Sequence, residues 1–364
     1  MPDAIEPQAQ PIPSTGPPEW APTVDDDSLA ASQPPRPHKA RAIFFGTDGL
    51  RAGWSFLLFY GMLIGCQIVC TLLMKLVHLN RFAPAKPGAP AQPMTVLLYS
   101  HGLGFVCSIL LAAVMARIEH RHLRQYGLGS FLPRAGQFLA GCLWGGGLMS
   151  LLIAALFFTH RLAFDGRLLH GGAIVQWGAI WAVTFLAVGL FEEYLTRGYL
   201  YFTLSRGFAG IAGSAGMTER RRRILGFWAT AFFFSALFGL SHYFNVGETS
   251  VGLWSAGLIG LMFAFSLWRT GSLWWAVGWH TAWDWMQSFV YGVRDSGRPI
   301  IHPLYATHPL GNTLFSGGPT GPEGSLYVFA ILLIAVVGVA LTLRSEPGSP
   351  SDPAFSPNMD HLRR

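Results

Sequence analysis

Long apolar stretches, separated by short polar connections, occupy most of the chain. Eight of them approach or exceed the length of about 20 residues that a helix needs to cross the hydrocarbon core of a bilayer. Their approximate limits are 54–79, 94–116, 136–158, 173–198, 225–243, 251–268, 272–290 and 325–343. The segment GYLYFTLSRGF keeps helical spacing after the fourth stretch and predicts an amphipathic continuation through Arg206. The pattern predicts an all-α fold, a polytopic membrane bundle of about eight transmembrane helices.

The two ends of the chain have a different composition. Residues 1–40 contain ten of the 24 prolines, an acidic cluster at 25–27 and almost no clustered apolar residues. The tail from Ser345 contains four prolines in its first thirteen residues. Segments that cannot bury a core stay disordered, so we expect disorder over 1–40 and 345–364.

Composition agrees with a membrane protein, since 51% of the 364 residues are hydrophobic and only 12% are charged. The net charge of +6 does not indicate a nucleic-acid partner, because the basic residues lie mostly in short loops. A cytoplasmic N-terminus leaves 17 Lys and Arg residues on the cytoplasmic side and 6 on the other, with Lys75 and Arg197 inside spans. This bias predicts a multi-pass protein of the cell membrane with both termini cytoplasmic.

Charged residues interrupt the fourth apolar stretch at FEEYLTRGYL, residues 191–200. A charge near the bilayer centre costs at least ~2.5 to 3.5 kcal/mol, so such a residue indicates a function and a partner. Residues four apart share a helical face, which predicts that Glu193 pairs with Arg197. Glu192 is rotated by ~100° from Glu193 and stays available for chemistry. In the alternative interpretation, the charges only hold helices together or mark a helix end.

Two later stretches contain polar pairs with the same spacing, Phe238 with His242 and His280 with Asp284. Counting ~1.5 Å per residue from the basic cytoplasmic ends at Arg206, Arg223 and Arg269 puts Glu192, His242 and His280 at depths of ~21, ~28 and ~16 Å. These depths overlap once helix tilts of ~20° are allowed. We therefore expect the three side chains to line one cavity.

Other residues with metal-binding or catalytic chemistry fit ordinary structural positions. The four cysteines all fall within apolar stretches, which favours small core residues over a disulfide framework or a metal site. They are Cys66, Cys70, Cys107 and Cys142. Single histidines on apolar helices are usually hydrogen-bonded core residues, and we assign no function to His78, His101, His160 or His120–His122.

The ordered set EEYLTR (192–197), FGLSH (238–242) and HTAWD (280–284) resembles the CPBP intramembrane proteases, also called the type II CAAX-processing or ABI family. The family pattern is EExxxR, FxxxH and HxxxN or HxxxD. RTGSLWWAVGWH (269–280) and TGPEGSL (320–326) are also similar to family members. The resemblance extends over about 170–345, so we expect N-terminal transmembrane helices over 41–170 and a protease core over 171–344. Asp284 stands where the eukaryotic CAAX enzymes carry asparagine.

The resemblance implies hydrolysis of a peptide bond inside the membrane. It implies that Glu192 and His242 activate a water molecule and that His280 and Asp284 stabilise the oxyanion. The supporting residues that it implies are Glu193, Arg197 and Phe238. An aspartate donates to an oxyanion only when protonated, so Asp284 is better suited to orient His280 or to help hold a metal.

Two mechanisms remain open at this stage. Glu192, His242 and His280 match the ligand set of a hydrolytic zinc site with water in the fourth position. The same residues also suit a metal-free water activated by glutamate. The lack of an HExxH motif favours the metal-free mechanism.

The predicted function is an intramembrane endopeptidase whose partners are the lipid bilayer and a membrane-anchored protein or peptide substrate. One alternative is a non-catalytic scaffold or immunity-type member of the same fold. A proton- or ion-coupled transporter could also use buried Glu, His and Asp residues, but the sequence contains no detectable inverted repeat. The loop over 291–325 is long enough for a lid, although a flexible connector is the simpler interpretation.

Overall fold

The computed structural model describes residues 43–46, 49–76, 94–245, 247–347 and 349–351. The chain divides into two units, residues 1–45 and 46–364. The predicted disordered segment 1–40 and His78 lie outside the described residues, as does most of the predicted C-terminal tail. All the helices and strands described below belong to the second unit, except that Phe45, the first residue of β1, belongs to the first.

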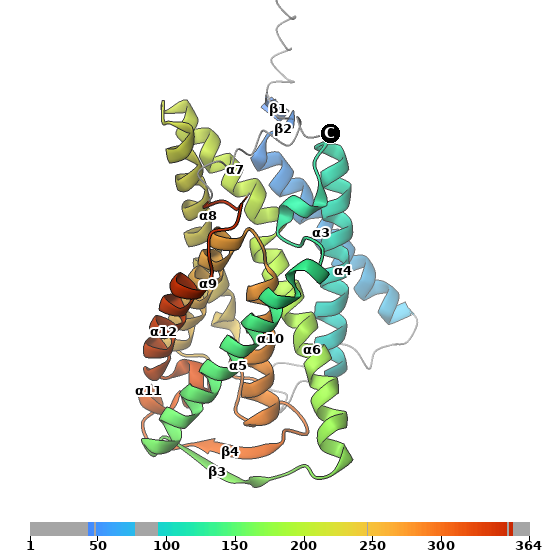
Figure 1. Cartoon of the computed structure of the whole chain (residues 1–364). Coiled ribbons are helices and arrows are strands. Elements are labelled where there is room, and N and C mark those ends of the chain that lie inside the picture. The colour runs from blue at the N-terminus through green and yellow to red at the C-terminus, as the bar shows by residue number, and fades with distance from the viewer. Residues whose placement is uncertain (1–42, 47–48, 77–93, 246, 348, 352–364) are drawn as a thin grey trace, which may run out of the picture. The chain divides into compact units, whose positions relative to one another are not determined.

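This unit is an all-α helical bundle, as the apolar pattern predicts (Figure 1). Helices occupy all eight predicted stretches. They are α3 (Ala52–Leu76), α4 (Met94–Ile118), α5 (Ala135–Phe158), α6 (Gly172–Arg197), α8 (Glu219–Ser241), α9 (Ser250–Thr270), α10 (Trp274–Asp284) and α12 (Tyr327–Thr342). Among the described residues, six spans are long and apolar enough to cross a membrane, and α12 is a shorter apolar helix. The seventh stretch consists of α10 and a π-helical continuation, η5 (Trp285–Val290). These features confirm an integral membrane protein.

Short elements connect the helices. They are β1 (Phe45–Gly46), β2 (Gly49–Leu50), η2 (Leu123–Tyr126), η3 (Leu132–Arg134), β3 (Leu162–Arg167), η4 (His242–Phe244), β4 (Tyr305–Pro309), α11 (Thr313–Ser316) and η6 (Pro322–Gly324). Strands β3 and β4 pair antiparallel at the end of the bundle away from the connection between α7 (Tyr199–Ser214) and α8 (Figure 1). The 291–325 connection is thus built from a strand, two helical turns and hydrogen-bonded loops rather than from a featureless linker.

The predicted amphipathic continuation after the fourth span is a separate helix, α7 (Tyr199–Ser214). Gly198 separates α6 from α7, because its backbone is not helical, with φ −91° and ψ −125°. A Cβ atom at Gly198 would lie 2.3 Å from the carbonyl oxygen of Tyr194, so the break needs glycine. Depths counted from Arg206 along one continuous helix are therefore not valid for Glu192.

Glycines bring α5 and α10 into close contact. A Cβ atom added at Gly141 would lie 2.1 Å from the carbonyl oxygen of Trp275. A Cβ atom added at Gly278 would lie 2.1 Å from the carbonyl oxygen of Phe138. Small residues allow membrane helices to approach at backbone distance and to gain van der Waals contact. This contact holds α10, which carries His280 and Asp284, at a fixed position in the bundle.

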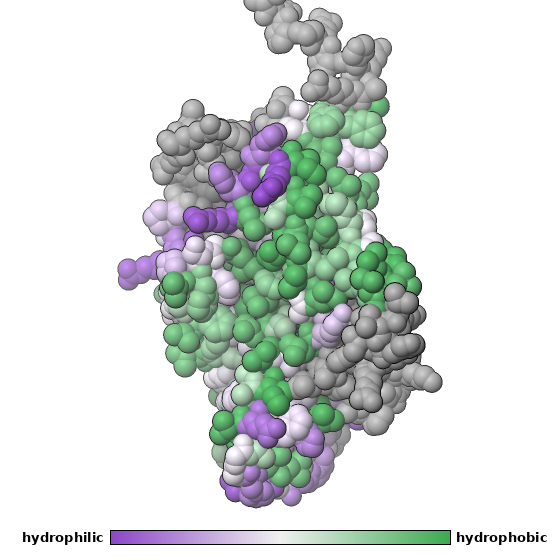
Figure 2. Space-filling model, turned by 90° about the vertical axis from the view of Figure 1, so that its right-hand side faces the viewer, coloured by the Kyte–Doolittle hydropathy of each residue, from purple (hydrophilic) through white to green (hydrophobic). Residues whose placement is uncertain are grey.

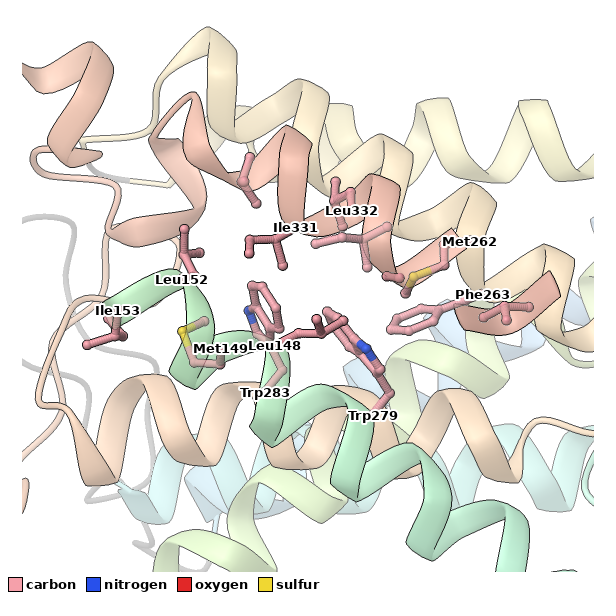
Figure 3. Close-up of a cluster of buried hydrophobic side chains, with 14 of the residues drawn as sticks. Leu148, Met149, Leu152, Ile153, Met262, Phe263, Trp279, Trp283, Ile331 and Leu332 are labelled. Atoms are coloured by element: carbon pink, nitrogen blue, oxygen red, sulfur yellow. The ribbon is translucent and has the colours of Figure 1, made fainter. Parts of the chain in front are cut away.

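A hydrophobic cluster fills the space between α5, α9, α10 and α12 (Figure 3). Leu152 and Met149 of α5, Phe263 of α9 and Trp279 of α10 are almost completely buried in it. The rings of Trp279 and Trp283 stack with centroids 4.4 Å apart. One side of α10 is therefore packed into the core, which leaves its other side for the polar residues.

The outer surface of the bundle is apolar over a wide area. Figure 2 shows one face on which hydrophobic side chains form a broad continuous region, with hydrophilic side chains gathered toward two ends. Leu143 and Leu341 are 79% and 78% exposed. Such a surface is suited to the hydrocarbon core of a lipid bilayer.

The chain stays attached to the bundle for several residues beyond α12. The Glu346 amide donates to the Arg269 carbonyl (3.0 Å), and the Ser351 amide donates to the Trp268 carbonyl (3.1 Å). The Gln137 side chain donates to the Glu346 carboxylate (2.5 Å). Proline composition alone did not predict these contacts, because they depend on free carbonyl groups at the end of α9.

Candidate active site

The predicted pair of Glu193 and Arg197 is confirmed on α6. Arg197 Nη1 lies 2.7 Å from Glu193 Oε2, and both side chains are buried. The guanidinium group also lies over the rings of Phe238 and Phe263, 5.5 and 5.2 Å from their centroids. Its Nε donates to the Gly260 carbonyl (3.4 Å). Arg197 therefore joins α6 to α8 and α9 and neutralises Glu193.

His280 on α10 lies among three carboxylates. Its Nδ1 is 3.0 Å from Glu193 Oε1, and its Nε2 is 3.5 Å from Asp284 Oδ2 and 3.8 Å from Glu192 Oε2. The contact with Glu193 fixes the ring and its tautomer, since an imidazole nitrogen facing a carboxylate donates its proton. Glu193 is thus shared between Arg197 and His280.

The neighbouring carboxylates differ in their access to solvent. The Glu192 side chain is 26% exposed, whereas Glu193 is 0% and Asp284 is 8% exposed. Glu192 is therefore the carboxylate of this group that a water molecule or a substrate reaches most easily.

His101 is a member of the site that the sequence reading left without a function. His101 lies on α4, and its Nε2 is 3.5 Å from Oε1 of Glu192 on α6. Its Nδ1 faces the Leu97 carbonyl at 3.0 Å and its ring meets Phe191 edge-on. A Cβ atom at Gly104 would lie 2.7 Å from the Phe191 ring, so glycine one turn after His101 lets α4 approach α6. The segment HGLG (101–104) was the local sequence sign of this close helix contact, and it does not identify α6 as the partner helix.

His242 lies at the C-terminal end of α8. Its Nδ1 faces the Phe238 carbonyl at 2.8 Å, and its ring contacts the Phe238 ring at 4.9 Å between centroids. Among the described residues, no hydrogen bond or ion pair joins His242 to Glu192 or His280. The structure thus brings Glu192 and His280 together, and the Phe238 ring lies 4.9 Å from the His242 ring and 6.4 Å from the His280 ring between centroids.

The fit of a divalent metal to this group can be judged from its ligand atoms. Zinc binds nitrogen and oxygen ligands at about 2.0 to 2.2 Å, so its ligands lie well within 4.8 Å of one another. Among the described residues, the three-residue group that satisfies this spacing consists of cysteines and does not include Glu192, His242 and His280. Glu192, His242 and His280 therefore do not have the spacing of a zinc ligand set.

A second group of acidic residues lies beyond Asp284 in the 291–325 connection. Glu323 Oε1 accepts hydrogen bonds from the amide and the hydroxyl of Ser296, and the Ser288 hydroxyl donates to Asp295 (3.5 Å). Burial raises the pKa of Asp295 well above its ordinary value, and the charges of Asp284 and Glu323 act in the same direction. A cavity of about 530 Å³ lies near this connection and is lined by loop residues such as Arg294 and Pro319, not by the motif residues.

Comparison with known protein families agrees with the motifs. Residues 174–286 match the family described as Type II CAAX prenyl endopeptidase Rce1-like. Over these residues the chain is similar to that family. The matched segment contains all three motifs and ends before the TGPEGSL stretch. No curated protein and no solved structure matches the chain.

Proposed function

We propose that this Rce1-like protein is an intramembrane endopeptidase that hydrolyses a peptide bond in a membrane-anchored protein or peptide. The observation that carries the proposal is the pairing of Glu192, a partly exposed carboxylate, with His280, whose ring is held by the buried Glu193. A scaffold or an immunity-type protein does not need an accessible carboxylate beside an oriented imidazole. The family match adds to the proposal, since it names peptidases.

In the proposed reaction, Glu192 acts as general base. A water molecule beside Glu192 gives up a proton to the carboxylate as its oxygen bonds to the scissile carbonyl carbon. The carbonyl oxygen becomes an oxyanion, which the Nε2–H of a doubly protonated His280 stabilises in this low-dielectric site. Nε2 of His242, whose Nδ1 donates to the Phe238 carbonyl, helps Glu192 to orient the water. The C–N bond then breaks, and the proton held by Glu192 passes to the departing amine. Addition of one water thus yields a new carboxyl group and a new amine.

The other residues hold these groups in place. Glu193 orients His280, Arg197 neutralises Glu193, and Asp284 limits rotation of the His280 ring from the Nε2 side. His101 faces one carboxylate oxygen of Glu192 while His280 faces the other. We propose His101 as a positioning residue that keeps Glu192 aimed at the water.

The proposed orientation places the α7–α8 connection in the cytoplasm, with both termini on the same side of the cell membrane. The support is the excess of Lys and Arg on that side, 17 against 6, including Arg220–Arg223. A fluorescent reporter that folds only in the cytoplasm is expected to be bright when it is fused to the C-terminus. A dark fusion at normal expression would contradict this orientation.

The function is tested by cleavage in detergent or liposomes. Purified wild type and Glu192→Gln are incubated with membrane peptides, including prenylated C-terminal peptides, and the products are identified by mass spectrometry. We expect wild type to cleave at defined bonds and Glu192→Gln to lose at least about 10²-fold in rate, because the amide keeps the packing and removes the base. Glu219→Gln is a matched control, because Glu219 is an exposed residue at the start of α8 that pairs with Arg222. Equal rates for wild type and Glu192→Gln would refute the catalytic assignment.

A further inference from the structure

Three of the four cysteines meet between α3 and α4. Cys66 and Cys70 lie one turn apart on α3, and Cys107 faces them from α4. Their Sγ atoms all lie within 4.8 Å of one another, and those of Cys66 and Cys107 are 2.6 Å apart. All three are free thiols, of which Cys107 is buried and the others are half-buried.

The three sulfurs converge closely enough to reach one metal ion, although the Cys66–Cys107 pair has to open from 2.6 Å to admit it. A thiolate binds a metal such as zinc at about 2.3 Å, so three sulfurs around one ion lie ~4 Å apart. Apolar packing requires only small residues at such a contact, which alanine also provides, and does not require three sulfur atoms to converge. Ile68 and Val69, between Cys66 and Cys70 on α3, are exposed apolar side chains.

The number and type of the donors indicate which ion the group accepts. Soft thiolate ligands select Cu(I), zinc and iron–sulfur clusters. Structural zinc sites use four ligands and iron–sulfur clusters use four cysteines, whereas this group has three members among the described residues. Cu(I) is a soft ion that accepts three sulfur ligands.

We propose that Cys66, Cys70 and Cys107 form a three-sulfur site for Cu(I). Each sulfur that binds as a thiolate releases its proton on coordination, so binding tightens as the pH rises. The ion bridges α3 and α4 and stabilises their contact, because it binds the folded chain and not the separated helices. The site is independent of Glu192 and of the proposed peptidase function.

The test is a Cu(I) titration of the purified full-length protein in detergent, under anaerobic reducing conditions, with bathocuproine disulfonate as the competing chelator. We expect wild type to retain one Cu(I) per chain in competition with the chelator. Cys66→Ser and Cys107→Ser are each expected to bind at least tenfold more weakly. Cys142→Ser is the matched control, because Cys142 lies in the apolar helix α5 outside the group, and it is expected to bind like wild type.

Two further measurements keep the proposal testable if a serine variant fails to fold. X-ray absorption at the copper edge of the wild-type complex is expected to show three sulfur ligands. Cu(I) is expected to raise the Tm of wild type and of Cys142→Ser equally. The proposal is overturned if reduced wild type withholds no copper, if Cys107→Ser binds it as tightly, or if the thiols only form a disulfide in air.

Discussion

Oε1 of Glu193 lies 3.0 Å from Nδ1 of His280, across the contact between α6 and α10. The other oxygen of the same carboxylate holds Arg197. Because one buried carboxylate serves both partners, the ring orientation of His280 depends on an ion pair that lies outside the reacting groups. Substitution of Arg197 is therefore expected to alter the ring orientation of His280 through Glu193.

Arg197→Ala is expected to lower the free energy of unfolding by about 3 to 5 kcal/mol, because the buried charge of Glu193 loses its guanidinium partner and keeps only the contact with His280. The double variant Arg197→Ala with Glu193→Gln is expected to regain part of that loss, since the amide carries no charge. Full recovery is not expected, because the contact with His280 also changes. Thermal unfolding in detergent measures each variant. A double variant no more stable than Arg197→Ala would show that the two residues are not coupled.

His101→Gln is expected to slow peptide cleavage by at least about 10²-fold while leaving Tm nearly unchanged, because Glu192 loses the group that faces its Oε1. The pH profile of cleavage is also expected to change shape, which a purely structural effect would not cause. His170→Gln is the matched control at an exposed loop position. If His101→Gln cleaves like His170→Gln, His101 does not position Glu192.

Gly278→Ala is expected to destabilise the bundle by about 1 to 3 kcal/mol, because the added methyl group overlaps the Phe138 carbonyl and pushes α10 away from α5. Cleavage is expected to fall with it, since α10 carries His280. Gly147→Ala is the control, because the space around Gly147 is open, and its effect should stay within about 1 kcal/mol. Equal stability of the two variants would argue against a close α5–α10 contact.

Asp295 makes stability depend on pH. Its pKa is raised in the folded protein, so the folded state favours the protonated carboxyl group more than the unfolded chain does. Its contribution is fully present below the unfolded pKa of about 4 and is lost as pH rises through the folded pKa. The pKa of Glu248 is also raised by burial, so it contributes with the same sign.

The comparison is between wild type and Asp295→Asn from pH 4 to 8. Wild-type Tm is expected to decrease with rising pH over this range, and the decrease is expected to be smaller in Asp295→Asn. A similar slope in both proteins would show that Asp295 does not titrate differently in the folded state.

The sequence alone determined the class of fold and the pair on α6. The lengths of the apolar stretches are set by the thickness of the bilayer, so helices occur at all eight predicted positions. Glu193 and Arg197 are four residues apart on one helix, and helix geometry brings such residues together whatever surrounds them. The order of the three motifs likewise predicted the similarity to the family whose model matches residues 174–286.

Only the tertiary structure decided which residues meet across helices. His101 next to Glu192, Glu193 shared with His280, and Cys107 beside Cys66 each join residues at least 41 positions apart in the chain. Such contacts depend on which helix faces pack together, and that packing is set by small residues such as Gly104 and Gly278 acting on distant partners. A local spacing rule contains the geometry of one helix and no information about its neighbour.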